Sequence, residues 1–190
     1  MKPIIAPSIL SADFGYLAKD IEMVNRSEAE WVHIDIMDGV FVPNISFGFP
    51  VLKYVAKLSK KPLDVHLMIV NPEKFIPEVK ALGAHTMNVH YEACTHLHRT
   101  VAAIKEAGLT PGIWFEPETA GKASEAYRQE EHMLTRNGAV ITTAGRRFWD
   151  LRDPWVRDYL RERVIEFLKS YGFGYVKIDY NDTVGIGCDK

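Results

Sequence analysis

Short apolar runs alternate with amphipathic stretches along the first 110 residues. Four apolar runs, each flanked by Gly, Pro, Asn or Asp, predict strands. These runs are Ile4 to Leu10, Trp31 to Met37, Leu63 to Ile69 and Thr86 to His90. Between them, apolar residues at three-to-four spacing predict helices over Tyr16 to Asn25, Pro50 to Leu58, Pro72 to Leu82 and Leu97 to Ala107. Four such βα units in a row indicate an α/β fold with a parallel sheet.

The pattern changes after residue 110. Gly112 to Phe115 and Tyr175 to Ile178 predict two further strands, and Pro154 to Tyr171 predicts a long amphipathic helix that ends before Gly172. Residues 119–150 are the hardest part to interpret. They contain a helical pattern over 123–134 and a short apolar run over 139–143 that we expect to be an extra strand within a long insertion.

Polar side chains interrupt the apolar runs near the carboxyl ends of the predicted strands. His33 and Asp35 lie two residues apart, and His66 occupies the corresponding part of the next strand. Side chains at positions i and i+2 of a strand share a face, so His33 and Asp35 are expected to point the same way. A single such residue is more often hydrogen-bonded structure than a ligand. Two imidazoles and a carboxylate on neighbouring strands, however, suit Zn²⁺, Fe²⁺, Mn²⁺ or Co²⁺.

Composition narrows the partners of the chain. The 190 residues are 47% hydrophobic and 25% charged, with a formal net charge of −2. We therefore expect no nucleic-acid or membrane binding, and a small molecule such as a sugar or sugar phosphate as the default partner. The two cysteines, Cys94 and Cys188, lie far apart, and we expect no signal peptide. Both observations favour a cytoplasmic protein.

Several long motifs in the first 110 residues resemble the ribulose-phosphate 3-epimerase family. They are Ala-Pro-Ser-Ile-Leu-Ser-Ala-Asp-Phe at 6–14, His-Ile-Asp-Ile-Met-Asp-Gly-Val-Phe-Val-Pro-Asn at 33–44, Leu-Asp-Val-His-Leu-Met at 63–68 and His-Tyr-Glu-Ala at 90–93. The resemblance implies a TIM barrel and a metal-dependent isomerase of the pentose phosphate pathway. It further implies that His33, Asp35 and His66 bind the metal and that Asp35 also acts as an acid/base. Ser8 would contact the substrate, and Met37 and Met68 would line the pocket.

The epimerase reaction needs more than this set of residues. Inverting a carbon next to a ketone requires one base, a metal that holds the enediolate oxygens, and a second acid on the opposite face. In the family, the second group is an aspartate on the seventh strand, which is also the fourth metal ligand, and glycine-bearing loops hold the phosphate. The sequence after residue 110 contains no matching Val-Asp-Gly-Gly motif or paired-glycine loop.

The remaining sequence resembles part of the catalytic barrel of family 36 glycoside hydrolases, mainly α-galactosidases. The similar motifs begin at Pro111, Asp150 and Tyr175. This resemblance implies that Asp179 is the nucleophile and that Lys177 contacts the sugar. A retaining glycosidase also needs a second carboxyl group about 5–5.5 Å from the nucleophile, and in that family it comes from a later strand.

Together the two resemblances predict a chimera with a junction near residue 110. We expect residues 1–110 to form an epimerase-like half barrel and residues 111–190 a glycosidase-like segment within one compact domain. The result would be an incomplete or hybrid barrel of about six to seven parallel strands, whereas a closed barrel has eight. Open strand edges predict self-association.

Three functions remain open for such a protein. The main interpretation is a chimera with little or no activity, and the alternatives are an active ribulose 5-phosphate epimerase and a glycosidase that uses Asp179. A further hypothesis is that Asp179 completes a four-ligand metal site with His33, Asp35 and His66.

Overall fold

The computed structural model describes residues 4–179 and 188–189, and its described part divides into two compact units. The first unit contains residues 4–114 together with Gly172–Lys177. The second contains Phe115–Tyr171 with residues 178–179 and 188–189. The sequence prediction of an epimerase-like part over 1–110 and a glycosidase-like part over 111–190 concerns ancestry and stays a prediction.

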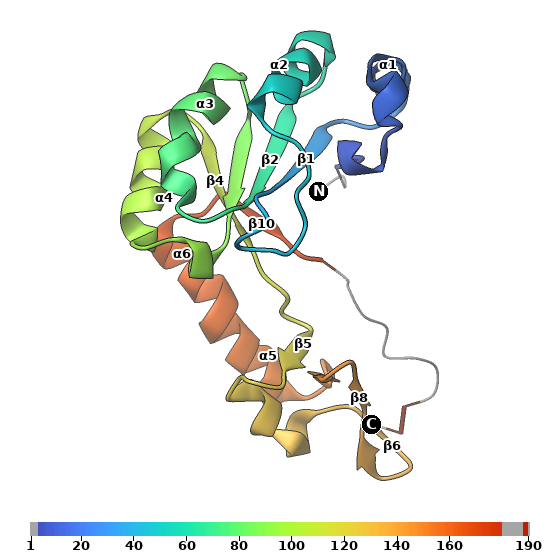
Figure 1. Ribbon diagram of the computed structural model, residues 1–190. Coiled ribbons are helices and arrows are strands. Elements are labelled where there is room, and N and C mark those ends of the chain that lie inside the picture. Colours follow the sequence, from blue (N-terminus) through green and yellow to red (C-terminus); the bar gives the residue numbers. More distant parts are fainter. Residues whose placement is uncertain (1–3, 180–187, 190) are drawn as a thin grey trace. The chain divides into compact units, whose positions relative to one another are not determined.

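The first unit is built on a parallel sheet of five strands in the order β1-β2-β3-β4-β10 (Figure 1). The strands are β1 Val32–Met37, β2 Leu63–Met68, β3 Thr86–Val89, β4 Thr110–Trp114 and β10 Tyr175–Lys177. Every neighbouring pair is parallel. The predicted α/β class is thus confirmed. The ladder of the described strands is open at β1 and β10, as expected for an incomplete barrel.

Two strand predictions differ from the structure. Residues 4–10 form no strand. Ser8 makes an isolated parallel bridge with His33, Pro7 has no N–H group for a ladder, and a 3₁₀ turn begins at Ile9. The run at 139–143 is split into two-residue antiparallel strands of the second unit. The parallel sheet therefore has five strands instead of six to seven.

Helices of the first unit follow its strands, as the apolar spacing predicted. They are α1 Leu17–Arg26, α2 Phe49–Leu58, α3 Ile76–Ala81 and α4 Leu97–Glu106, with short 3₁₀ turns at Ile9–Ser11, Phe14–Tyr16, Pro72–Phe75 (η3) and Tyr91–Ala93. Figure 1 shows α3 and α4 alongside the same side of the strands. Leu52, Val55 and Ile104 from these helices are fully buried, as are Ile34 and Val65 of the sheet. Burial of each such side chain contributes about 1.5–3 kcal/mol.

The alternate positions of β1, β2 and β3 are polar and yet buried. They are His33, Asp35, Asp64, His66, Thr86 and Asn88. Because side chains alternate between the faces of a strand, this polar set lies on the opposite face from Ile34, Val65 and their neighbours. The first unit therefore has an apolar face covered by helices and a polar face that carries the candidate site.

Gly112 allows three strands to meet closely. It pairs with Asn88 of β3 on one side and Tyr175 of β10 on the other. A Cβ atom at this position would collide with the Asn88 side chain and approach the Tyr175 ring to 3.0 Å. The absence of a side chain thus helps β10 to dock beside β4.

The second unit is mainly antiparallel. Its strands are β5 Thr119–Gly121, β6 Thr135–Arg136, β7 Ala139–Val140, β8 Thr142–Thr143 and β9 Arg146–Phe148, in a sheet β5-β9-β8 and a hairpin β6-β7. The helix expected over 123–134 is replaced by two 3₁₀ turns, Ala126–Arg128 and Glu130–His132. Gln129, at φ −85° and ψ 60°, separates them and interrupts the helical geometry.

The long helix predicted over 154–171 is present as one helical run of three parts. These are α5 Pro154–Leu160, a π-helical segment at Arg161–Glu166 and α6 Phe167–Tyr171. Asp153 caps its start by accepting a hydrogen bond from the Trp155 N–H, and Gly172 follows its end at φ +68°. Val156 of α5 forms a buried core with Ala120, Met133 and Trp149. In the part of the chain that the structure describes, no helix has the length and apolar character needed to span a membrane.

Candidate metal and acid–base site

His33, Asp35 and His66 converge on the polar face of the parallel sheet. Asp35 of β1 pairs in register with His66 of β2, and His33 precedes Asp35 by two residues on the same face. All three are buried, and one potential ligand atom from each lies within 4.8 Å of the other two. The described residues therefore contain a His-Asp-His group that could bind a divalent metal ion, as predicted.

Asp35 is the centre of the hydrogen-bond network in this group. Its Oδ1 atom lies 3.0 Å from His33 Nε2 and 2.9 Å from His66 Nδ1. Its Oδ2 atom accepts a hydrogen bond of 2.7 Å from the Ser8 hydroxyl. The bridge between Ser8 and His33 holds the Ser8 backbone beside β1. Ser8, which the resemblance made a substrate contact, thus touches the candidate catalytic carboxylate in this structure.

Asp64 contacts the group through His33 and was not among the predicted site residues. Its Oδ2 atom lies 2.7 Å from His33 Nδ1, and its Oδ1 atom accepts a 3.2 Å hydrogen bond from Asn88. A carboxylate on the second ring nitrogen fixes the orientation of a metal-binding histidine. The signal was present in the sequence, since Asp64 shares the i, i+2 spacing with His66 that Asp35 has with His33.

His90, which ends the predicted strand over 86–90 as His33 and His66 lie on two earlier ones, extends the network although the predicted metal ligands did not include it. Its Nε2 atom lies 2.8 Å from Nε2 of His66, which already contacts Asp35 through Nδ1. The His90 ring stacks on His66 and on Trp114, with centroids 4.9 and 5.0 Å apart. His66 is consequently held from both ring nitrogens.

Burial and charge act together on the titration of this group. Burial opposes a charge on His33, but hydrogen bonds and charges from Asp35 and Asp64 raise its pKa to about 9. Burial likewise opposes ionisation of Asp35, but hydrogen bonds from His33, His66 and Ser8 hold its pKa far below the usual range. Burial lowers the pKa of His66, and the positive charges of Lys177 and His33 add to this shift while Asp35 opposes it. Asp35 is therefore an anion at neutral pH.

Lys177 enters the same group from β10. Its Nζ atom donates a 2.9 Å hydrogen bond to Asp35 Oδ1 and lies 3.0 Å from His66 Nδ1. β10 places it there by pairing with β4, where Lys177 is opposite Trp114. Lys177 was predicted from the glycosidase resemblance as a sugar contact. The structure places its ammonium group beside the candidate metal ligands Asp35 and His66. Its role toward a sugar stays a prediction.

The other predicted site residues are placed as follows. Met37 and Met68 pair in register at the carboxyl ends of β1 and β2 and are partly buried, which is compatible with lining a site beside Asp35. Asp179 is partly buried and belongs to the second unit. Its predicted roles, as a glycosidase nucleophile or a fourth metal ligand, stay predictions.

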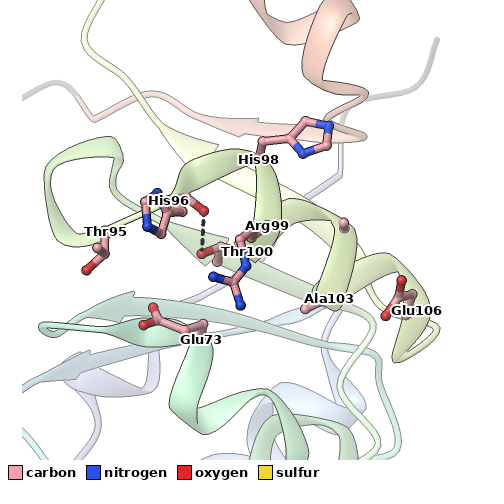
Figure 2. Close-up of a pocket in the computed structure, with 9 residues that line it drawn as sticks. Glu73, Thr95, His96, His98, Arg99, Thr100, Ala103 and Glu106 are labelled. Carbon is pink, nitrogen blue, oxygen red and sulfur yellow. Dashed lines mark hydrogen bonds between the residues drawn. The ribbon is translucent and has the colours of Figure 1, made fainter.

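The first unit also contains a hollow of about 700 Å³, formed in part by η3 and α4. Figure 2 shows Glu73 on one side of it, and His96, Arg99 and Thr100 on the other. The Thr100 hydroxyl donates a 3.2 Å hydrogen bond to the carbonyl oxygen of His96, the N-cap residue of α4, as an ordinary i−4 contact. None of the predicted site residues lines this hollow, so it is separate from the Asp35 group.

Comparison with known proteins identifies the relatives of this chain. Residues 4–148 match the family described as Ribulose-phosphate 3 epimerase family. The ribulose-phosphate 3-epimerase of Bacillus subtilis (strain 168) is 49% identical over 115 residues, which are 60% of this chain and 53% of that protein. The enzyme of Helicobacter pylori (strain J99) is 38% identical over 147 residues, covering 77% and 67% respectively. The chain thus spans about half the length of several curated relatives that it matches.

Solved structures give a second comparison. GH36 alpha-galactosidase AgaA from Geobacillus stearothermophilus superposes with a TM-score of 0.54 and 19% identity over 63% of this chain and 21% of that one. The alpha-galactosidase from Lactobacillus brevis superposes with a TM-score of 0.54 and 17% identity over 69% of this chain. At such low identity these likenesses concern the fold alone.

Proposed function

Because the chain belongs to the ribulose-phosphate 3-epimerase family over residues 4–148, we propose that its first unit performs metal-dependent proton chemistry on a ketose phosphate. The proposed reaction is removal of a proton from the carbon next to a ketone, which is the first half of a ribulose 5-phosphate epimerisation. The chain spans only about half the length of several relatives, so the full reaction and its substrate are also proposals.

The observation that carries this proposal is the convergence of His33, Asp35 and His66 on one face of β1 and β2. Two imidazoles and one carboxylate fit a first-row divalent ion. When bound by these three residues, such an ion would supply positive charge to the oxygens of an enediolate. The ring of His33 is already oriented for that role by Asp64.

Asp35 is the candidate base. It is ionised at neutral pH, and Ser8 fixes its Oδ2 atom at 2.7 Å. Proton abstraction requires the carboxylate to lie within hydrogen-bond reach of the substrate carbon. Met37 and Met68, at the ends of the two strands, would provide the apolar wall that keeps water from the carbanion.

Exchange and inversion test different parts of the proposal. One base suffices to exchange the substrate proton with solvent, whereas inversion needs a second acid on the opposite face. We therefore expect deuterium from D₂O to enter ribulose 5-phosphate at C3 when Zn²⁺, Mn²⁺ or Co²⁺ is present. Formation of xylulose 5-phosphate, measured in a coupled assay, reports whether a second acid also acts.

Asp35→Asn is the decisive variant for this test. We expect at least about a hundredfold loss of deuterium incorporation, as for removal of a general base. Asp158→Asn is the matched control, because Asp158 is an exposed carboxylate paired only with Arg161 in the contacts seen here. Equal incorporation in wild type and Asp35→Asn, or none in wild type with metal, would contradict the proposal.

We further propose that the chain arose by fusion, with the segment beginning near Pro111 derived from a glycoside hydrolase barrel. Its support is the set of glycosidase-like motifs at Pro111, Asp150 and Tyr175. The epimerase family match runs on to residue 148, past the predicted junction at 110. Aryl-α-galactoside hydrolysis that disappears in Asp179→Asn would favour the glycosidase alternative over the epimerase.

Two further predictions concern the cellular compartment and the oligomeric state. A reducing compartment such as the cytoplasm agrees with the free thiols of Cys94 and Cys188. Self-association is expected from the open edges of the five-stranded sheet. Light scattering during size-exclusion chromatography tests it, and a stable monomer at all concentrations would contradict it.

A further inference from the structure

The Asp35 group contains a cation that belongs to the protein itself. Lys177 Nζ lies 2.9 Å from Asp35 Oδ1 and 3.0 Å from His66 Nδ1, which are two of the three candidate ligand atoms. The third, His33 Nε2, lies 3.0 Å from the same Asp35 oxygen. An ammonium group in this place makes the contacts that a divalent ion would make.

Lys177 is held in this place by its surroundings. Its side chain is only 15% exposed and that of Asp35 only 9%. β10 is anchored by ladder pairing with β4 and by stacking of Tyr175 on Trp31, with ring centroids 6.3 Å apart. The ammonium therefore reaches Asp35 from a strand whose position is fixed, and the short distance is not a chance contact of an exposed side chain.

Charge makes the two cations exclusive. The partly buried Lys177 ammonium and a divalent ion would share the same carboxylate oxygen at a separation of a few ångströms, where like charges repel by several kcal/mol. Asp35 is the only carboxylate of the ligand set His33-Asp35-His66, and Lys177 Nζ already occupies its Oδ1 atom. A metal ion can thus take this position only when Lys177 leaves it.

We propose that Lys177 is an intramolecular competitor for the divalent metal, and that displacement of its ammonium from Asp35 is a required step of metal binding. The inference uses only the ligand group and does not require epimerase activity. The metal affinity of the site then depends on β10, because Lys177 of that strand contacts His66 although it lies 111 residues further along the chain.

A cobalt titration tests the proposal. Co²⁺ bound to nitrogen and oxygen ligands has visible absorption bands, so its dissociation constant can be measured without any turnover. We expect Lys177→Met to bind Co²⁺ about tenfold or more tightly than wild type, because a unit charge beside the ligands has been removed. Lys177→Arg keeps the charge and should not gain affinity. Lys57→Met, at an exposed position of α2, is the control for a charge change elsewhere in the first unit.

A labelling experiment on the wild-type protein gives the second measurement. Reductive methylation followed by mass spectrometry reports how accessible each lysine is. Saturation with Co²⁺ should increase methylation of Lys177 while leaving Lys57 unchanged. This measurement decides the question if Lys177→Met does not fold.

The outcomes separate this proposal from the proposed function. Equal or weaker Co²⁺ affinity in folded Lys177→Met, including no binding in any variant, would overturn the competition. Unchanged methylation of Lys177 in metal-saturated wild type would do the same. Failure of the proposed function appears instead as absent deuterium exchange in protein that demonstrably binds metal.

Discussion

Both units of the protein contain a histidine–aspartate pair, and the two pairs have opposite surroundings. In the first unit His33 Nδ1 lies 2.7 Å from Asp64 Oδ2, with side-chain exposures of 9% and 0%. In the second, His132 Nδ1 lies 2.8 Å from Asp153 Oδ2, with exposures of 18% and 19%. The pair itself is therefore almost the same in both places.

What differs is the partner of the other ring nitrogen. His33 Nε2 faces Asp35, which is shared with His66 and Lys177. His132 Nε2 has Glu131 at 3.8 Å, an exposed carboxylate, and the His132 ring stacks on Trp155 at 3.8 Å between centroids. The first pair thus belongs to a converging ligand group, whereas the second braces the start of α5. A histidine–aspartate pair by itself does not indicate a functional site.

Removal of one carboxylate from each unit tests this comparison most strongly. Asp35→Asn leaves Lys177 and protonated His33 without their shared anion, so we expect it to lower the free energy of unfolding by about 3–5 kcal/mol. Asp153→Ala removes the side-chain acceptor that caps α5 and should cost about 1 kcal/mol. Urea unfolding followed by circular dichroism measures both values. Equal costs would show that the carboxylate shared by His33, His66 and Lys177 matters no more for stability than a helix cap, and would undermine the distinction.

Thiol reactivity sharpens the same contrast between buried and exposed groups. Burial is the main cause that raises the pKa of Cys94 in the first unit to about 11, whereas Cys188 in the second unit is exposed. The thiolate is the reactive form, so Cys94 should react with iodoacetamide at pH 8 about a hundredfold more slowly than Cys188.

Mass spectrometry of timed samples gives the two rates separately. Urea-unfolded protein is the control, in which the two thiols should react at similar rates. A fast reaction of Cys94 in the folded protein would mean that this part of the first unit opens readily.

The elements of the first unit could be predicted because short β-rich segments with apolar residues at alternate positions lie between turn-forming residues. Trp31 to Met37 and Leu63 to Ile69 match β1 and β2 to within one residue. The pairing of β10 with β4 could not be predicted, because periodicity says nothing about which distant strands become neighbours. The position of Lys177 beside Asp35 depends on that pairing and was therefore missed.

In the second unit, the secondary-structure prediction was wrong for a different reason. Asn137 and Gly138, at φ 52° and 73°, form the turn between β6 and β7. An Asn-Gly pair is a strong hairpin signal, but the flanking strands have only two residues each, too few for an alternating pattern. The helical spacing over 123–134 was misleading because the apolar residues there pack around Trp149 and Met133 from 3₁₀ turns.

Removing the carboxylate of Asp38 has the smallest expected effect on stability. It tests whether burial or membership of the first unit determines how much stability the loss of a carboxylate costs. Asp38 lies in the first unit, at the end of β1, but outside the buried group. Its carboxylate accepts hydrogen bonds from the N–H groups of Val40 and Phe41 at 2.8 Å and of Val70 at 2.9 Å. Burial slightly opposes its ionisation, but these N–H groups lower its pKa. Its stabilising effect is therefore complete above the unfolded pKa of about 3.9 and disappears as the pH falls through the lower folded value.

We accordingly expect Asp38→Asn to cost about 0.5–1.5 kcal/mol at pH 7 and less at pH 3. Paired urea unfolding curves of wild type and variant at the two pH values measure this difference, in which the titration of all other carboxylates cancels. A cost that grows toward pH 3 would contradict the direction of the pKa shift. Asp38 shares the first unit with Asp35, but none of its three hydrogen bonds involves His33, His66 or Lys177. A cost near that of Asp35→Asn would therefore show that membership of the first unit, and not burial among cations, determines how much a carboxylate contributes to stability.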